Sequence, residues 1–179
     1  MKNHLFTILT LMLLLNVNVV IAQEDDSSRF NLMKAPIDKA ARNAVWRTDF
    51  YICTGIAYAK SAGRTTDDFM KFVADTHVNT LNSIKGKGLE PIINLANFLI
   101  TSYPDGTFEI ISESPSTVKY KTNRPYISYF TKGYMVGVTI DEFEKCLWGH
   151  FKLMLKSLGI DFDYHIEGDF VEAEVTLME

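Results

Sequence analysis

The sequence predicts an α+β fold in which a four-stranded antiparallel sheet packs against about four helices in a single domain. Three observations support this prediction. Helical patterns come first, over residues 36–62, 65–84 and 90–103, and two short strands follow them. An amphipathic helix and a second pair of strands then complete the chain. Four antiparallel strands packed on helices would bury the apolar side of every element.

The first 22 residues are typical of a secretory signal peptide. Lys2 precedes the apolar run 5–15, and Val20, Ile21 and Ala22 provide small or apolar residues before Gln23. The alternative is a retained membrane anchor, because residues 5–22 are about the minimum length that spans a bilayer. Asn16 and Asn18 interrupt the run and favour cleavage. We therefore expect an exported protein, periplasmic or secreted.

Residues 23–34 are polar and acidic and predict a disordered leader, followed by one α+β domain over residues 35–179. Loss of residues 1–22, which carry one lysine, takes the formal net charge from −4 to −5. A mildly acidic domain without a basic stripe argues against nucleic acid as a partner. It also argues against docking on an anionic membrane once the signal peptide is removed.

The first helix is expected to begin near Pro36, a residue favoured in the first helical turn, and to end near Ala62 before Gly63. Asp49 and Cys53 are spaced i and i+4 and flank its apolar stripe. The stripe itself comprises Ala41, Val45, Thr48, Ile52, Ile56 and Ala59.

The second helix starts at Thr65 or Thr66, and its stripe includes Phe69, Val73, His77, Thr80 and Ile84. The third helix, 90–103, is apolar over much of its circumference, which predicts deep burial. Strands are expected at 107–112 and 117–122. Residues 123–137 predict a loop with a short helical turn.

The fourth helix, 140–158, has the strongest local signals. Thr139 can cap it, Glu142 can close a capping box, and Gly159 is placed to end it. Its apolar residues recur every three or four positions, so they share one stripe. Residues 161–177 then alternate around the turn Glu167-Gly168-Asp169, which predicts a β-hairpin whose apolar face packs against that stripe.

Cys146 and His150 lie one helical turn apart on this fourth helix. The spacing suits two metal ligands, or a thiolate whose pKa is lowered by an imidazole. His77 would be a third ligand if the two helices face each other. A buried structural cysteine beside a hydrogen-bonded histidine is the simpler interpretation. Cys53 and Cys146 can form a disulfide in an oxidising compartment, or remain free.

Aromatic residues crowd the connection before the fourth helix, and they predict an apolar pocket for a small apolar or aromatic molecule. Ordinary core packing explains the same composition. No glycine-rich phosphate loop, nucleophile elbow or zinc-helix motif occurs in the sequence. The candidate ligand-binding residues are Tyr126, Tyr129, Phe130, Tyr134 and, on the helix, Trp148.

The end of the chain resembles a known superfamily. Cys146 in a helix, Leu158-Gly159-Ile160, a strand with Tyr164, and Gly168-Asp169 before a last strand are similar to the C-terminal half of 4-vinyl reductase-type small-molecule-binding domains. The related L-2-amino-thiazoline-4-carboxylic acid hydrolases share this half. In these families a cysteine commonly follows the Gly-Asp pair, whereas Glu172 occupies the corresponding place here.

The resemblance implies a small ligand held between helices and sheet, since relatives bind small hydrophobic molecules, metals or haem. Our first hypothesis is an exported small-molecule-binding domain with an apolar, aromatic-lined pocket. The second is a hydrolase of the amino-thiazoline type that uses Cys146 and His150. The third is a metal- or haem-binding protein that uses His77, Cys146 and His150, and the fourth is a structural or partner-binding protein. The sequence predicts no particular ligand, cofactor or oligomeric state.

Overall fold

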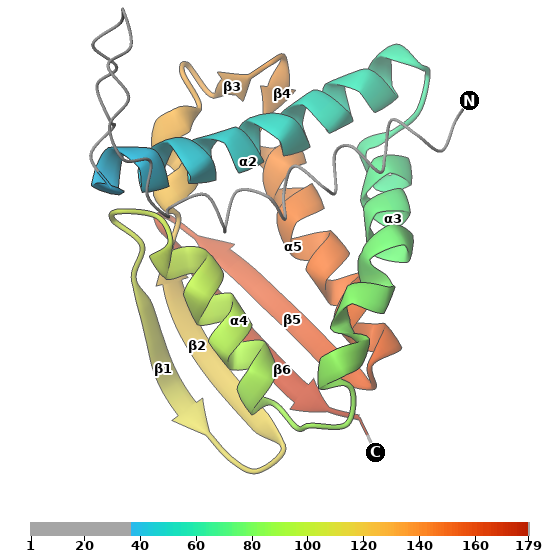
Figure 1. Ribbon diagram of the computed structural model, residues 1–179, viewed down its shortest axis with the longest axis vertical. Coiled ribbons are helices and arrows are strands. Elements are labelled where there is room, and N and C mark those ends of the chain that lie inside the picture. Colours follow the sequence, from blue (N-terminus) through green and yellow to red (C-terminus); the bar gives the residue numbers. More distant parts are fainter. Residues whose placement is uncertain (1–36, 179) are drawn as a thin grey trace, which may run out of the picture.

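A four-stranded antiparallel sheet with helices on one face forms the centre of the protein in the computed structural model, which describes residues 37–178 and, from residue 42 on, their side chains (Figure 1). The predicted signal peptide 1–22 and leader 23–34 lie outside these residues. The elements are α2 (Ile37–Ser61), α3 (Thr66–His77), η1 (Val78–Ile84), α4 (Glu90–Thr101), β1 (Phe108–Glu113), β2 (Thr117–Asn123), η2 (Pro125–Tyr129), β3 (Tyr134–Met135), β4 (Val138–Thr139), α5 (Ile140–Ser157), β5 (Ile160–Glu167) and β6 (Phe170–Leu177).

The predicted α+β class and the two predicted strand pairs are confirmed. The strand order is β1-β2-β6-β5, so the last strand of the chain pairs with the second strand at the centre of the sheet. Side chains alternate along β2 and β6 between a buried face under the helices and an open face. On the open face Lys119 pairs with Glu174 and Lys121 with Glu172, at N···O distances of 2.6 and 3.5 Å.

The helix α5 and the hairpin β5–β6 associate as the sequence predicts. The Thr139–Glu142 capping box is formed, and Gly159 ends the segment with φ of 79°. Phe151 is buried, and its ring lies edge-on to the ring of Phe162 at 5.3 Å between centroids. The apolar stripe of α5 and the apolar face of the hairpin therefore bury each other.

The inward face of α2 differs from the predicted stripe. Asp49, Cys53 and Ile56 are buried, whereas Thr48 is exposed. The buried positions follow steps of three and four residues, but the set is rotated by one position toward the pair that was expected to flank it. The hydrophobic pattern did not predict this buried face because an aspartate, Asp49, lies at its centre.

Two glycines on α2 and α5 lie directly against side chains of α3. A Cβ atom at Gly55 on α2 would lie 2.4 Å from the ring of Phe69 on α3, and one at Gly149 on α5 would lie 2.3 Å from the sulfur of Met70. Both distances are far below van der Waals contact. A side chain at either position would force the ring of Phe69 or the thioether of Met70 to move, so the two glycines leave room for these α3 side chains.

Helix α4 is amphipathic, so the prediction that it is buried around most of its circumference is wrong. Ile92, Ile93 and Ile100 are buried, but Phe98 and Leu99 are 66% and 49% exposed. The reason is its position in the outer layer, where one side meets the sheet and the other meets no further layer of the described chain (Figure 1).

The connection 123–137 contains the predicted short helical turn, η2, and also the strand β3, which pairs with β4 just after the connection. The predicted helix from residue 65 to 84 is divided, since α3 ends at His77 and η1 continues as a 3₁₀ helix. Among the described helices none has the length and apolar character needed to cross a membrane.

Candidate functional site

A groove lies between the N-terminal half of α4 and the turn that joins β1 to β2. Its volume is about 560 Å³. In Figure 1 the β1–β2 turn lies below the N-terminal end of α4. The residues that line the groove come from these two segments and from the strands beside the turn. The lining residues are Leu89, Glu90, Ile93, Asn94, Ile110, Glu113, Ser114, Pro115 and Val118.

The opposite end of α4 is fastened to the sheet. A Cβ atom at Gly106 would lie 1.9 Å from the carbonyl oxygen of Ile100, so only glycine permits this tight turn into β1. The side chain of Asn123, at the end of β2, accepts a hydrogen bond from the amide of Thr107 at 2.9 Å and donates one to the carbonyl of Asp105 at 2.6 Å. The helix and hairpin are thus held together at this end, and the groove lies toward the other.

The lining combines an apolar floor with acidic walls. Leu89, Ile93 and Val118 are buried, and Ile110 is 47% exposed at the rim. Glu90, in the first turn of α4, and Glu113, at the end of β1, are the only charged side chains of the lining. Among residues 42–178 neither carboxylate forms an ion pair. The groove therefore presents an apolar surface with negative charge at its edge.

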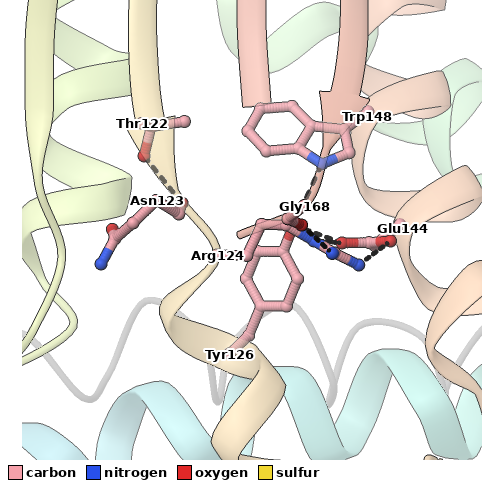
Figure 2. A network of polar contacts seen from close by, with 7 residues as sticks. All are labelled: Thr122, Asn123, Arg124, Tyr126, Glu144, Trp148 and Gly168. Atoms are coloured by element: carbon pink, nitrogen blue, oxygen red, sulfur yellow. Dashed lines mark hydrogen bonds and ion pairs between the residues drawn. The ribbon is translucent and has the colours of Figure 1, made fainter. Parts of the chain in front are cut away.

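A second cleft, of about 420 Å³, lies at the start of α5 and is polar. Its lining comprises Arg124, Asp141, Glu144, Lys145, Tyr164 and Ile166. Two acids and two bases leave the lining without net charge. Arg124 and Glu144 also form a bidentate ion pair with each other, with Nε to Oε1 at 2.6 Å and Nη2 to Oε2 at 2.7 Å (Figure 2).

This ion pair is the centre of a buried network that holds three segments together. Arg124 also donates from Nη1 to the carbonyl of Gly168 in the β5–β6 turn, at 2.6 Å. The hydroxyl of Tyr126 donates to Glu144 at 2.8 Å, and the indole of Trp148 donates to that hydroxyl at 3.3 Å (Figure 2). The bonds join the end of β2, the hairpin turn and α5. We therefore interpret the second cleft as a by-product of a structural network.

The five aromatic residues expected to bind a ligand do not surround either cleft. Tyr126, Phe130 and Trp148 are buried, Tyr129 is half-buried, and Tyr134 is 57% exposed. The rings of Tyr126 and Phe130 pack on Phe143, with centroids 5.3 and 5.2 Å away, and Trp148 packs beside Phe162 and Tyr164. The apolar side chains that line the groove beside α4 are instead aliphatic, and the second cleft contains one aromatic side chain, Tyr164.

Cys146 is buried in the core, and burial raises the pKa of its thiol to about 12. His150 donates from Nδ1 to the carbonyl oxygen of Cys146, at 2.8 Å, so this hydrogen bond joins the imidazole to the backbone of Cys146 and not to its thiol. Burial lowers the pKa of His150, and the neighbouring His77 lowers it further. Cys53 is also a free, buried thiol, with a pKa raised by burial to about 12.

The residues expected to bind a metal are not assembled into a site in the part of the chain that the structure describes. His77 and His150 are close enough to influence each other, but no group of three or more histidine, cysteine, aspartate or glutamate side chains there could hold an ion. The Cys146 thiol would also need to ionise before it could bind a metal, and its raised pKa opposes this.

Besides Glu144, the structure reveals a second buried acid whose interactions the sequence did not indicate. Asp49 is 1% exposed, and the hydroxyl of Tyr103, just after α4, lies 2.8 and 3.0 Å from its two oxygens. Burial raises the pKa of Asp49 to about 7, although the hydrogen bond from Tyr103 partly opposes the shift. This pair joins α2 to α4 and does not line either cleft.

The groove residues were missed by sequence analysis because they come from separate elements without a common spacing. Glu90 was expected only as the start of a helix, Ile110 only as part of a strand, and Glu113 only as part of the connection between two strands. The available signal was an acidic residue at each of two element ends, with no basic residue beside either. The two acidic residues indicate a common site only when α4 and the β1–β2 turn are known to face each other.

No family model matches this chain, and no curated protein matches it. Among solved structures, the chain is similar to a mutant of an Fe(II) unliganded H-NOX protein from K. algicida, at 12% sequence identity. The match covers 88% of this chain and 82% of the other, with a TM-score of 0.28. At that TM-score the two backbones differ too much for any property of the H-NOX protein to be carried over.

Proposed function

We propose that this chain is a small-molecule-binding domain and that the groove between α4 and the β1–β2 turn is its ligand site. The observation that carries the proposal is the groove itself, with about 560 Å³ above a floor of Leu89, Ile93 and Val118. Small-molecule sites are mostly apolar, have volumes of roughly 300–1,000 Å³ and contain a few polar groups.

The location agrees with what the resemblance to 4-vinyl reductase-type domains implies, because the groove lies between a helix and the sheet. We also propose that the chain belongs to that superfamily. Export is a further proposal, and it is based on the sequence of residues 1–22. The position of the site differs from the sequence-based expectation, because aliphatic side chains form its floor and most of the expected aromatic residues are part of the core.

A cysteine hydrolase is less consistent with the geometry. A nucleophilic cysteine needs an accessible thiol with a lowered pKa, whereas Cys146 is 2% exposed and its pKa is raised. We expect the thiol to remain inert to iodoacetamide from pH 6 to 9 in the native protein, as followed by mass spectrometry. Rapid alkylation of Cys146 under these conditions would restore the hydrolase hypothesis.

A neutral fluorescent probe, 1-N-phenylnaphthylamine, tests the proposal. Two adjacent residues of β1 form a matched pair, because Ile110 lines the groove at 47% exposure and Ile111 lies outside it at 50%. We expect the purified protein to enhance probe fluorescence saturably. We expect Ile110→Asp to weaken binding at least tenfold, because it places a carboxylate against the apolar ligand. Ile111→Asp should leave the affinity within twofold of wild type.

Equal effects of the two substitutions, or no saturable binding at all, would contradict the proposed site. Native mass spectrometry of the purified protein provides a second test. An additional mass that disappears on denaturation, and is reduced in Ile110→Asp but retained in Ile111→Asp, would support the same site.

A further inference from the structure

We infer that the ligand of the groove carries a positive charge beside an apolar body, as an alkylammonium ion does. This inference rests on the proposed function and specifies its ligand class. It starts from the two walls of the groove, where Glu90 and Glu113 are the only charged lining residues and both are acidic. They come from different elements, so the negative charge faces the groove from the helix and from the hairpin.

Neither carboxylate is neutralised within the described chain. The ion pairs of residues 42–178 involve other acids, and the remaining polar lining residues, Asn94 and Ser114, are uncharged. The Oγ atom of Ser114 is already bonded to the backbone of Thr117. A ligand cation would therefore find two carboxylates that have no ion-pair partner among residues 42–178, and no lining group that repels it.

Two features oppose a cation and favour an anion. The N-terminus of α4 carries the positive end of the helix dipole, and Leu89 at its N-cap provides no side-chain hydrogen bond. Lys85 and Lys87 also precede the helix, but neither lines the groove. Glu90 already places a negative charge in the first helical turn, which offsets the dipole there. The second carboxylate, Glu113, then leaves the lining with net negative charge.

The apolar floor determines the rest of the ligand. Leu89, Ile93 and Val118 are buried beneath the groove and offer no hydrogen-bonding side chain, so they favour hydrocarbon over a polar body. A small polar cation would interact only with the exposed carboxylates, and ion pairs between solvated partners contribute little binding free energy. The combination of floor and walls points to an amphipathic cation.

Three probes with the same ten-carbon chain separate charge from hydrophobicity. Decylammonium, decanol and decanoate would each displace 1-N-phenylnaphthylamine from the purified protein at pH 7, below their aggregation concentrations. We expect decylammonium to compete about fivefold better than decanol, and decanoate to compete worst, because an exposed ion pair changes affinity by about fivefold or less. Salt at 0.5 M should reduce the advantage of decylammonium without changing decanol.

Glu113→Gln and Glu90→Gln identify the carboxylates responsible. Each should weaken decylammonium competition two- to fivefold and leave decanol unchanged. Glu109→Gln is the matched control, because it removes the same charge from an exposed position of β1 outside the groove. It should alter none of the three probes. This pattern would assign the charge preference to the groove and not to the net charge of the protein.

The outcomes separate the inference from the proposed function. If 1-N-phenylnaphthylamine binds and responds to Ile110→Asp, but decanoate competes as well as decylammonium, the groove is a ligand site and the charge inference is wrong. A preference for decylammonium that survives both glutamate substitutions would overturn it as well. If the neutral probe does not bind, the proposed function fails and the inference fails with it.

Discussion

Removal of Arg124 should destabilise the fold strongly, because it leaves a carboxylate buried without its counter-charge. Glu144 is 4% exposed and receives two of its three hydrogen bonds from Arg124, at 2.6 and 2.7 Å. Loss of one partner from a buried ion pair typically costs about 3–5 kcal/mol. The carbonyl of Gly168 would lose its bond to Arg124 in the same substitution. We expect Arg124→Met to lower the free energy of unfolding by about 4 kcal/mol.

A matched surface pair provides the control. Lys119 and Glu174 are joined at 2.6 Å, the same distance as the shorter Arg124–Glu144 contact, but their side chains are 53% and 42% exposed. Lys119→Met should cost less than about 1 kcal/mol, since exposed ion pairs contribute little. Urea unfolding followed by tryptophan fluorescence measures both variants, and Trp148 reports directly on the network.

The double variant Arg124→Met/Glu144→Met completes a thermodynamic cycle. Removal of both charges should be less damaging than the sum of the single variants, with a coupling energy of about 2 kcal/mol or more. Similar unfolding midpoints for Arg124→Met and Lys119→Met would refute the reasoning. Additive single effects would refute it too, because they would mean that the buried carboxylate does not depend on its partner.

Three further predictions concern the core. Phe151→Ala should destabilise by about 3–5 kcal/mol in urea, because the ring is buried against the hairpin, whereas exposed Lys152→Ala should change stability by about 0.5 kcal/mol or less; similar midpoints would contradict the packing of α5. The pKa of Asp49 is raised from 3.8 to about 7, so the stability associated with its proton is fully present below pH 3.8 and lost as pH rises through about 7. The free energy of unfolding of Asp49→Asn should therefore rise relative to that of wild type between pH 4 and 8, by up to about 4 kcal/mol. A difference between the two proteins that does not change with pH would exclude this linkage. The Tyr120 hydroxyl is buried without a hydrogen-bond partner among the described residues, so Tyr120→Phe should raise stability by up to about 1 kcal/mol in thermal unfolding, and a clear loss would reveal a partner.

Local patterns predicted the second half of the fold well. The Thr139–Glu142 capping box, the stripe ending at Leu158, and the turn at Gly168 all act between residues near in sequence, so their spacing is enough to place them. The buried face of α2 was harder to predict. Its central residue is Asp49, and an acid is buried there because Tyr103, 54 residues later in the chain, provides a hydroxyl. The hydrophobic pattern of the residues around Asp49 cannot indicate a hydrogen-bond partner so distant in the sequence.

The candidate site was not predictable for the same physical reason. The groove exists because α4 and the β1–β2 hairpin are held together at Gly106 and Asn123, away from the groove itself. Its lining brings Glu90 together with Glu113, whose positions have no fixed relation before folding. The aromatic content of residues 126–134 predicted a ligand pocket, but most of these aromatic side chains pack in the core.

The position of a bound ligand tests the central proposal most directly. Titration of ¹⁵N-labelled protein with 1-N-phenylnaphthylamine, followed by two-dimensional ¹H–¹⁵N NMR, reports which backbone amides sense the probe. We predict saturable shifts concentrated at Ile93, Asn94, Ile110, Glu113 and Val118, which line the groove. Shifts centred instead on Arg124 and Lys145, beside the second cleft, or no saturable shifts at all, would contradict the proposed site.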